Sequence, residues 1–386
     1  MGFGTGVREA FALQPGIDFL NNGSFGATPR IVRDAQRRWQ DALERQPVSF
    51  FVDTLDGALD AALSRLAPLV GASPTDLVFV DNATTGIQAF LSSARWGPGD
   101  RVAVTSHGYG AVRQALRHAR DRVGVEIVEI PIPFPISGPG AVVDAIRAGW
   151  VDGTRALIVD AVTSPTGLVL PVADIAAFAA ARGATVVVDG AHAPLHLPVD
   201  LASLGAVGVA GWVGNLHKWA FAPKGAALLW CPPERQSALH PAVISHGYGA
   251  GFRAEFHWLG TRDPSAWLAA PDGLAFAEAL GVARIRAWNA DLREEAAERL
   301  AARWGTARPA PPAMLGAMCT LALPFHADGT PEVAVSLRRA LWERHRIEVP
   351  IIPFGGRCWV RISAQVFNTR DDYQRLAEVV GPSGIA

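Results

Sequence analysis

A carboxylate and an amine in the middle of the chain stand where two predicted strands end. Asp189 follows the β-branched run 186–188, and Lys218 follows the apolar segment 206–213 after a short polar stretch. In an open α/β sheet, ligands bind in the crevice at the carboxyl ends of the strands, so we expect both side chains to face it. Pyridoxal 5'-phosphate (PLP) uses such a pair: a lysine forms a Schiff base with it, and a carboxylate keeps its pyridine nitrogen protonated.

Each residue taken alone has a plainer interpretation. A strand-end aspartate is often a turn or helix cap, and most lysines are solvated surface charges. The pairing of the two favours a cofactor site.

The segments around the two residues resemble a known family. VVVDGAHAP (186–194) and GNLHKW (214–219), the second followed by PKGAALLW (223–230), are similar to class V aminotransferases, a family of fold-type I PLP enzymes. The closest resemblance is to the isopenicillin N epimerase-like branch, and it extends over residues 19–369. It implies that Lys218 binds PLP, that Asp189 pairs with the pyridine nitrogen, that His192 lies beside the ring hydroxyl and that His217 lies on the phosphate side.

The order of predicted elements agrees with this family. Predicted strands at 77–80, 102–104, 125–130 and 156–160 alternate with predicted helices, which indicates a largely parallel sheet. From residue 271 the pattern changes to a long helix over 275–304, a strand at 320–323, a helix over 331–344 and a strand at 358–363. We therefore expect an α/β protein of the fold-type I PLP-dependent transferase type, with a mainly parallel seven-stranded sheet in a large domain and a smaller α+β domain.

The expected domain boundaries follow from the same pattern. An N-terminal segment, residues 1–45, should pack with the small domain. Residues 46–270 should form the large PLP-binding domain, and residues 271–386 the small C-terminal domain.

Four further positions are candidates for binding the cofactor. Thr84 and Thr85 begin the helix after strand 77–80, where free N–H groups and hydroxyls suit a phosphate, although simple helix capping is the alternative. By the resemblance, His107 stacks on the ring as a catalytic residue, and Ser164 contacts the ring hydroxyl. The family often has a histidine where Ala161 stands, so that residue's role does not carry over.

The resemblance also implies a homodimer with shared active sites. FHWLGTRD (256–263) is similar to a family segment whose threonine, here Thr261, reaches the phosphate in the neighbouring protomer. A plain loop hydroxyl is the alternative interpretation of Thr261.

The expected substrate is a small-molecule amino acid. Arg361 in RISAQVFNT (361–369) matches the family arginine that grips the substrate α-carboxylate through a bidentate fork. LNNGSFG (20–26) resembles a segment on the substrate side of the cofactor, which makes Asn21 and Asn22 weaker candidates for substrate contact.

Composition argues against several classes of protein. Lys+Arg 35 against Asp+Glu 36 gives a net charge of -1, so neither a nucleic acid nor a membrane surface is an expected partner. The three cysteines are too few for a disulfide framework, which favours a cytoplasmic location. We expect neither export nor a membrane anchor, since residues 1–16 show no basic region followed by an apolar core and no apolar stretch reaches the ~20 residues of a membrane span. His192 and His196 are four apart, but Pro194 intervenes and no glutamate follows His192, so no metal site is expected.

The residues do not fix the reaction. Loss of a bond at the α-carbon can lead to several outcomes with the same cofactor. We rank epimerisation first by the resemblance, then C–S lyase chemistry by β-elimination, then transamination. A second acid or base opposite Lys218 is not identified. Cys358 sits in an apparent strand, which argues against a cysteine desulfurase.

Two alternatives belong to other functional classes. A non-catalytic PLP-fold binding protein is one, although the intact Lys218 and Asp189 weigh against it. A hydride-transfer enzyme is the other, but the glycine-rich stretch 247–251 lacks the dinucleotide-binding spacing.

Overall fold

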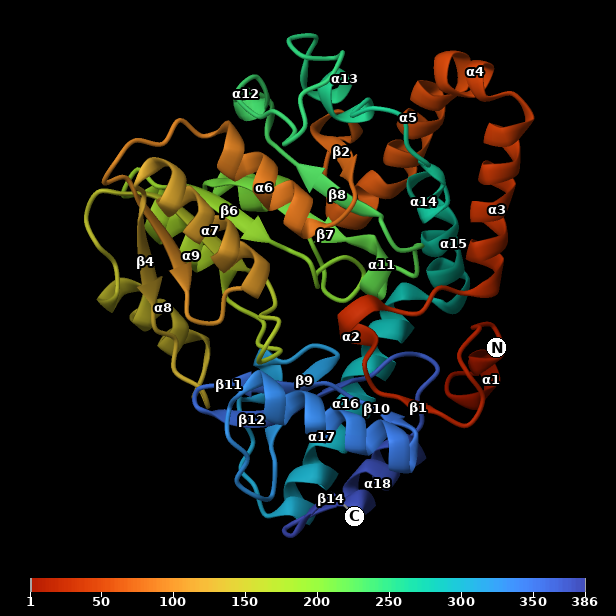
Figure 1. Cartoon of the computed structure of the whole chain (residues 1–386), viewed down its shortest axis with the longest axis vertical. Helices are drawn as coiled ribbons and strands as arrows, with labels where there is room; N and C mark the ends of the chain where they lie inside the picture. The colour runs from red at the N-terminus through yellow and green to blue at the C-terminus, as the bar shows by residue number, and fades with distance from the viewer. Residues whose placement is uncertain (1, 386) are drawn as a thin grey trace.

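A seven-stranded sheet forms the centre of the protein, whose structure is a computed structural model that describes residues 2–385 (Figure 1). The strand order is β2-β8-β7-β6-β5-β3-β4. Strands β4, β3, β5, β6 and β7 pair in parallel, whereas β8 pairs antiparallel with β7 and β2. The predicted mainly parallel seven-stranded sheet is confirmed. The strands are β2 (Leu77–Val80), β3 (Arg101–Thr105), β4 (Glu126–Ile130), β5 (Thr154–Asp160), β6 (Thr185–Asp189), β7 (Val209–Asn215) and β8 (Ala227–Trp230).

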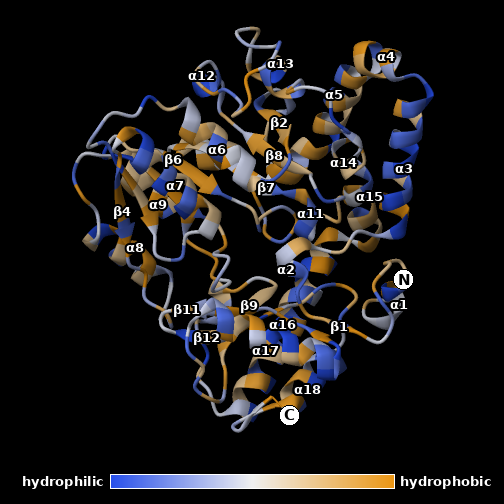
Figure 2. Ribbon diagram, viewed as in Figure 1, coloured by the Kyte–Doolittle hydropathy of each residue, from blue (hydrophilic) through white to orange (hydrophobic). Residues whose placement is uncertain are grey.

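Both faces of this sheet are buried, which explains why its strands are short apolar runs and not alternating patterns. Val186 and Val188 of β6 point into one hydrophobic core, and Val187 points into a second core on the other face. Helices α8 (Pro139–Ala148) and α9 (Val172–Ala180) contribute to the first core. Helices α6 (Ala83–Ser93) and α7 (Gly110–Val123) contribute to the second. Figure 2 shows the hydrophobic central strands.

A second, smaller sheet lies below the first in Figure 1. Its antiparallel order is β11-β12-β9, and helices α16, α17 and α18 accompany it. The single helix predicted over 275–304 is wrong, because Gly281 takes a φ of 87° and separates two helices. The elements are α15 (Ala270–Leu280), α16 (Val282–Trp304), β9 (Met318–Ala322), α17 (Pro331–His345), β11 (Ile351–Phe354), β12 (Arg357–Ser363) and α18 (Arg370–Val379).

The N-terminal segment joins the smaller sheet's region. Strand β1 (Asp18–Phe19) pairs in parallel with β10 (Ile347–Glu348), and the N–H of Gly4 donates to the carbonyl of Val366 at 2.7 Å. These contacts agree with the expected packing of this segment, although the domain boundaries stay predictions. Helix α2 (Asn22–Phe25) follows β1 and lies between the two sheets (Figure 1).

The remaining elements are short or peripheral. Helix α3 (Arg30–Arg45) contacts α14 (Ser265–Leu268) and α15. None of the helices in residues 2–385 is long and apolar enough to cross a membrane. The others are α1 (Thr5–Arg8), α4 (Pro47–Ser49), α5 (Leu55–Leu66), α10 (Leu201–Ala206), α11 (Leu216–Trp219), α12 (Pro233–Gln236), α13 (Phe252–His257), β13 (Val380–Gly381), β14 (Gly384–Ile385) and helical turns at 50–54, 67–70, 74–76 and 312–314.

Candidate active site

Asp189 and Lys218 lie at the carboxyl ends of neighbouring strands. Asp189 is the last residue of β6, and Lys218 lies in α11, which directly follows β7. Both side chains are buried, and each shifts the pKa of the other through its charge. The Asp189 Oδ1 atom accepts the Ala191 N–H at 3.0 Å, which fixes the orientation of the carboxylate.

The Lys218 amine is held in a weakly solvated environment. Burial, together with the charge of Arg361, lowers its pKa to about 8, while Asp189 and Asp160 oppose the shift. The Lys218 Nζ atom lies 3.1 Å from His192 Nε2. A lysine with this pKa supplies far more neutral amine near pH 8 than a solvated one.

Asn22 supports the backbone of Lys218 from the side of α2. Its amide nitrogen donates to the Lys218 carbonyl at 2.9 Å, and its Oδ1 accepts the Ala27 N–H at 3.2 Å. The side chain is fully buried, so the expected substrate contact of Asn22 is replaced by a structural role. Asn21 likewise donates to Glu348 Oε1 at 3.0 Å and is buried.

Arg361 is a buried guanidinium that pairs with no carboxylate in residues 2–385. It lies on β12 with 3% of its surface exposed. It donates to the Ser164 carbonyl, to Ser164 Oγ at 3.4 Å and to Ser24 Oγ at 3.1 Å. Its Nε atom is buried without an acceptor. Such an arrangement is costly unless an anion neutralises it, which a ligand carboxylate would do.

Ser164 therefore lies beside Arg361. Its predicted contact to the ring hydroxyl stays a prediction. Ser24 is a residue that the sequence interpretation did not single out, although it lies in the same LNNGSFG segment as Asn21.

The two threonines at the start of α6 have different environments. The Asn82 Oδ1 atom accepts both the N–H of Thr85 at 3.0 Å and its hydroxyl at 3.3 Å, so Thr85 takes part in helix capping. Thr84 is exposed at the same helix N-terminus and is the better phosphate candidate. His217 donates from Nδ1 to the Ala226 carbonyl at 3.2 Å, and burial lowers its pKa to about 4.

Thr261 is exposed in the loop after α13. It lines a cavity of about 280 Å³ together with Thr85 of the same chain. Its expected contact with a partner's phosphate remains a prediction.

His107 does not take the position that the resemblance implied. It is fully buried, with Nδ1 2.7 Å from Thr166 Oγ1 and Nε2 3.1 Å from the Ile132 carbonyl. Phe134 and Phe354 pack edge-on against its ring. With both nitrogens engaged and no exposed face, His107 is a structural residue and is not placed to stack on a cofactor.

Tyr109, two residues further along the same loop, is the aromatic residue nearer the crevice. Its side chain is 43% exposed, and it interacts electrostatically with Arg361. Its backbone N–H acts to lower the pKa of the Asp160 carboxyl group, against the larger effect of burial. The sequence carried a signal for Tyr109, because it is an aromatic residue in the loop after β3.

Asp160 is a second buried carboxyl group that sequence reasoning left without a role. It ends β5 and pairs in register with Asp189 at the end of β6. Burial and the charge of Asp189 raise the pKa of Asp160 well above its ordinary value. The neutral acid is therefore the favoured form of Asp160 beside an ionised Asp189.

The cysteines are unsuited to nucleophilic chemistry. The Cys358 thiol is buried and donates to the Asp328 carbonyl at 3.0 Å, and burial raises its pKa. Burial also raises the pKa of Cys231 and Cys319 to about 12. Thiolates, the reactive form, are thus disfavoured at all three positions.

These groups suit PLP by their chemistry. An amine of lowered pKa can bond to an aldehyde, a buried carboxylate can hold a pyridinium proton, and Thr84 offers a hydroxyl at a helix N-terminus for a phosphate. The unpaired Arg361 adds a place for a substrate carboxylate.

Comparison with known proteins gives one consistent family. The family model described as Aminotransferase class-V matches residues 40–376. An L-cysteine desulfhydrase of Arabidopsis thaliana is 32% identical over 95% of this chain and 88% of its own length. The isopenicillin N epimerase of Streptomyces clavuligerus is 32% identical over 97% of this chain and 96% of its own length.

Solved structures share the fold. The cystine C-S lyase C-DES in complex with cysteine persulfide has a TM-score of 0.81 at 20% identity, covering 95% of this chain and 99% of that one. At this level of identity the likeness bears on architecture, and it agrees with the expected fold class.

Proposed function

Because this chain belongs to the class V aminotransferase family, we propose that it is a PLP-dependent enzyme that removes the α-proton of an amino-acid substrate. PLP, when bound, withdraws the electron pair that remains on the α-carbon after a bond there is broken. Lys218 would hold the cofactor covalently, Asp189 would hold the proton on its pyridine nitrogen, and Thr84 and the N-terminus of α6 would hold its phosphate.

The observation that carries the substrate class is the unpaired guanidinium of Arg361. It is buried, its Nε lacks an acceptor, and no carboxylate of residues 2–385 forms an ion pair with it. A substrate α-carboxylate would complete this group and fix the orientation of the α-carbon. Once the substrate's own amine has replaced it on the cofactor, Lys218 would take up the α-proton, because its lowered pKa makes the free amine a competent base near neutral pH.

Elimination of a sulfur leaving group is the outcome that we favour. The Cα–H bond breaks with the proton going to Lys218, its electron pair forms a Cα–Cβ double bond, and the Cβ–S bond breaks with its own electron pair leaving on sulfur. Relatives named L-cysteine desulfhydrases support this outcome. The buried thiols support it as well, since none is suited to accept sulfur from the substrate as a desulfurase requires.

Epimerisation, which the sequence alone placed first, is the second candidate. The isopenicillin N epimerase relative matches almost end to end. Inversion requires an acid that returns the proton from the other face, and the exposed phenol of Tyr109 near Arg361 is a candidate for it. Transamination ranks third.

One experiment separates these outcomes. The enzyme is incubated with a panel of amino acids in deuterated water, while α-deuteration, sulfide and keto acids are followed together. Sulfide with pyruvate from L-cysteine supports elimination. Deuterium at an inverted α-carbon without sulfide rejects elimination in favour of epimerisation. If Lys218→Ala protein still bonds covalently to PLP after borohydride treatment, the role of Lys218 is wrong.

A further inference from the structure

Three aromatic side chains form a connected group beneath Lys218. The Trp219 indole N–H donates to His192 Nδ1 at 3.4 Å, and His192 Nε2 lies 3.1 Å from Lys218 Nζ. His196 stacks on Trp219, with ring centroids 4.4 Å apart and an interplanar angle of 27°. His192, His196 and Trp219 are all buried.

The hydrogen bonds determine where the His192 proton lies. An indole N–H can only donate, so His192 Nδ1 must accept and carries no proton. A neutral imidazole then has its proton on Nε2, which faces Lys218 Nζ. An Nε2–H group needs a lone pair opposite it, and the lysine nitrogen offers one only when it is uncharged.

His196 fixes the position of His192 through the backbone. The Ala317 N–H donates to His196 Nε2 at 2.6 Å, so the His196 proton must lie on Nδ1. That Nδ1–H then donates to the His192 carbonyl at 2.8 Å. Every hydrogen-bonding atom of the His196 ring is therefore satisfied in one tautomer.

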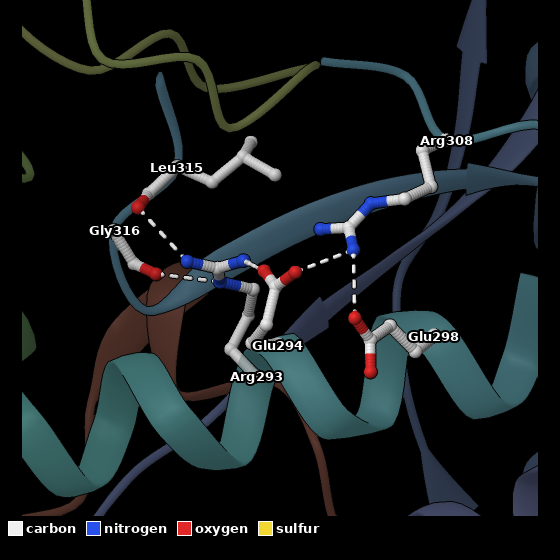
Figure 3. A network of polar contacts seen from close by, with 6 residues as sticks. All are labelled: Arg293, Glu294, Glu298, Arg308, Leu315 and Gly316. Carbon is white, nitrogen blue, oxygen red and sulfur yellow. Dashed lines mark hydrogen bonds and ion pairs between the residues drawn. The ribbon is translucent and has the colours of Figure 1, made fainter. Parts of the chain in front are cut away.

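The smaller sheet's region anchors this group. Arg293 of α16 donates from Nε to the Gly316 carbonyl at 2.8 Å and from Nη2 to the Leu315 carbonyl at 3.0 Å (Figure 3). Glu294, which also pairs with Arg308, holds the Arg293 guanidinium. A side chain at Gly316 would collide with the His196 ring. The segment that supplies the Ala317 N–H is thus fixed against His196.

We infer that Trp219 and His196 are positioning residues that hold His192 as its Nε2–H tautomer, so that His192 donates to the uncharged amine of Lys218. The network favours the uncharged form of the lysine, which can bond to an aldehyde and accept a proton. This inference deepens the proposed function and rests on the role of Lys218 in it.

Burial and the charge of Arg361 favour the uncharged amine of Lys218, whereas the charges of Asp189 and Asp160 oppose it. Lys218 faces Arg361, Asp189 and Asp160, and His192 faces Lys218, Arg361, His196 and His217. Burial together with the cations lowers the pKa of His192 well below its ordinary value, so it stays neutral at physiological pH.

The tautomer can be measured in the unchanged protein, with one variant used only to assign the signals. Nitrogen-15 NMR of the apoprotein with labelled histidine distinguishes the two neutral tautomers and the imidazolium, and the His192 signals are those lost in His192→Gln. We expect the neutral Nε2–H form at pH 9, above the midpoint near 8 at which Lys218 loses its proton. A neutral Nδ1–H form or an imidazolium at His192 would overturn the inference.

A second experiment tests the effect on Lys218. The rate at which PLP attaches to the apoprotein is followed across pH, and it should rise through a midpoint near 8 as Lys218 loses its proton. In Trp219→Phe, His192 is free to move its proton to Nδ1 and to accept from a charged lysine. The midpoint should then rise by about one pH unit, with attachment at pH 7 about tenfold slower.

Trp267→Phe is the matched control. Trp267 is also buried, and its indole N–H donates to the Gly225 carbonyl at 2.9 Å, outside this network. In Trp267→Phe, the pH midpoint of PLP attachment should equal that of the unchanged protein. An unshifted midpoint in Trp219→Phe refutes the inference. Failure of PLP to attach at Lys218 in every protein, including the unchanged one, would instead refute the proposed function and leave the NMR result standing.

Discussion

The buried guanidinium of Arg361 determines how the substrate would be held. Lysine at this position would keep a charge but lose the planar fork that binds a carboxylate through two parallel hydrogen bonds. We expect Arg361→Lys to raise KM and to lower kcat/KM by on the order of 10²-fold. Steady-state kinetics with the best amino-acid substrate would show this.

Arg357→Lys on the same strand is the control for that change. The guanidinium carbon of Arg357 lies 5.0 Å from the centre of the Trp359 ring, and we assign Arg357 no role in substrate binding. KM should therefore stay within about twofold. An unchanged KM in Arg361→Lys would contradict the assigned role.

The two paired carboxyl groups at the ends of β5 and β6 should respond differently to the same substitution. Asp189→Asn removes the charge that holds the pyridinium proton, so turnover should fall by on the order of 10³-fold while PLP still binds. Asp160 favours its neutral form, which asparagine imitates, so Asp160→Asn should cost less than about tenfold. Equal losses in the two variants would show that Asp189 has no special role.

Some of these residues could be predicted from sequence and others could not. Asp189, Lys218 and Arg361 were predicted because short motifs place them at strand ends or on a strand. His107 and Asn22 were assigned from their segments alone, and the direction of a side chain in a loop or at the start of a short helix depends on packing from distant parts of the chain. Thr166 and Phe354 enclose His107, and no local pattern reveals them.

At the scale of elements, the loop after α2 lies so close to the backbone of Lys218 that only glycine fits at position 26. Gly26 has a φ of 70°, and an added Cβ would collide with the carbonyls of His217 and Lys218. Gly16 has the same φ but open space around it. We expect Gly16→Ala to cost about 1 kcal/mol of unfolding free energy, and Gly26→Ala at least twice that, with weakened PLP binding.

Denaturant unfolding and PLP titration of the two variants would measure this difference. Both glycines have the same positive φ, so the comparison sets the collision at Gly26 against the open space at Gly16. Equal stability and equal PLP affinity would mean that the loop can retreat from α11.

Element types followed well from the sequence where apolar runs were bounded by turn residues, as in β2 and β6. The break between α15 and α16 was missed because one glycine within a helical pattern is often tolerated, and only the positive φ of Gly281 shows that it ends a helix. The position of β8 between β2 and β7 was not predicted either, since strand order depends on long-range pairing.

For the whole molecule, we predict a homodimer in which Thr261 completes the phosphate site of the partner protomer. Its hydroxyl is exposed in the single chain, which leaves it free for such a contact. Sedimentation at low concentration should show a dimer, and Thr261→Ala should lower PLP affinity by roughly tenfold, the loss of about one charge-assisted hydrogen bond. Thr75 is also an exposed threonine, and Thr75→Ala should leave the PLP affinity unchanged. A fully active monomer would contradict the prediction.

The pairing of β1 with β10 bears on how this chain is made. Residues 18–19 are translated long before residues 347–348. The carbonyl of Phe19 also accepts a hydrogen bond from the side chain of Asn368, which is translated later still. Contacts of such sequence separation close late, because the ordering cost of the intervening chain comes first. The nascent protein can therefore fold its central sheet while translation continues. Helix α2 and Arg361 come into contact only after nearly the whole chain has been translated. A product truncated before the last strands would contain Lys218 but not Arg361. We expect such a product to bind PLP but not the substrate carboxylate.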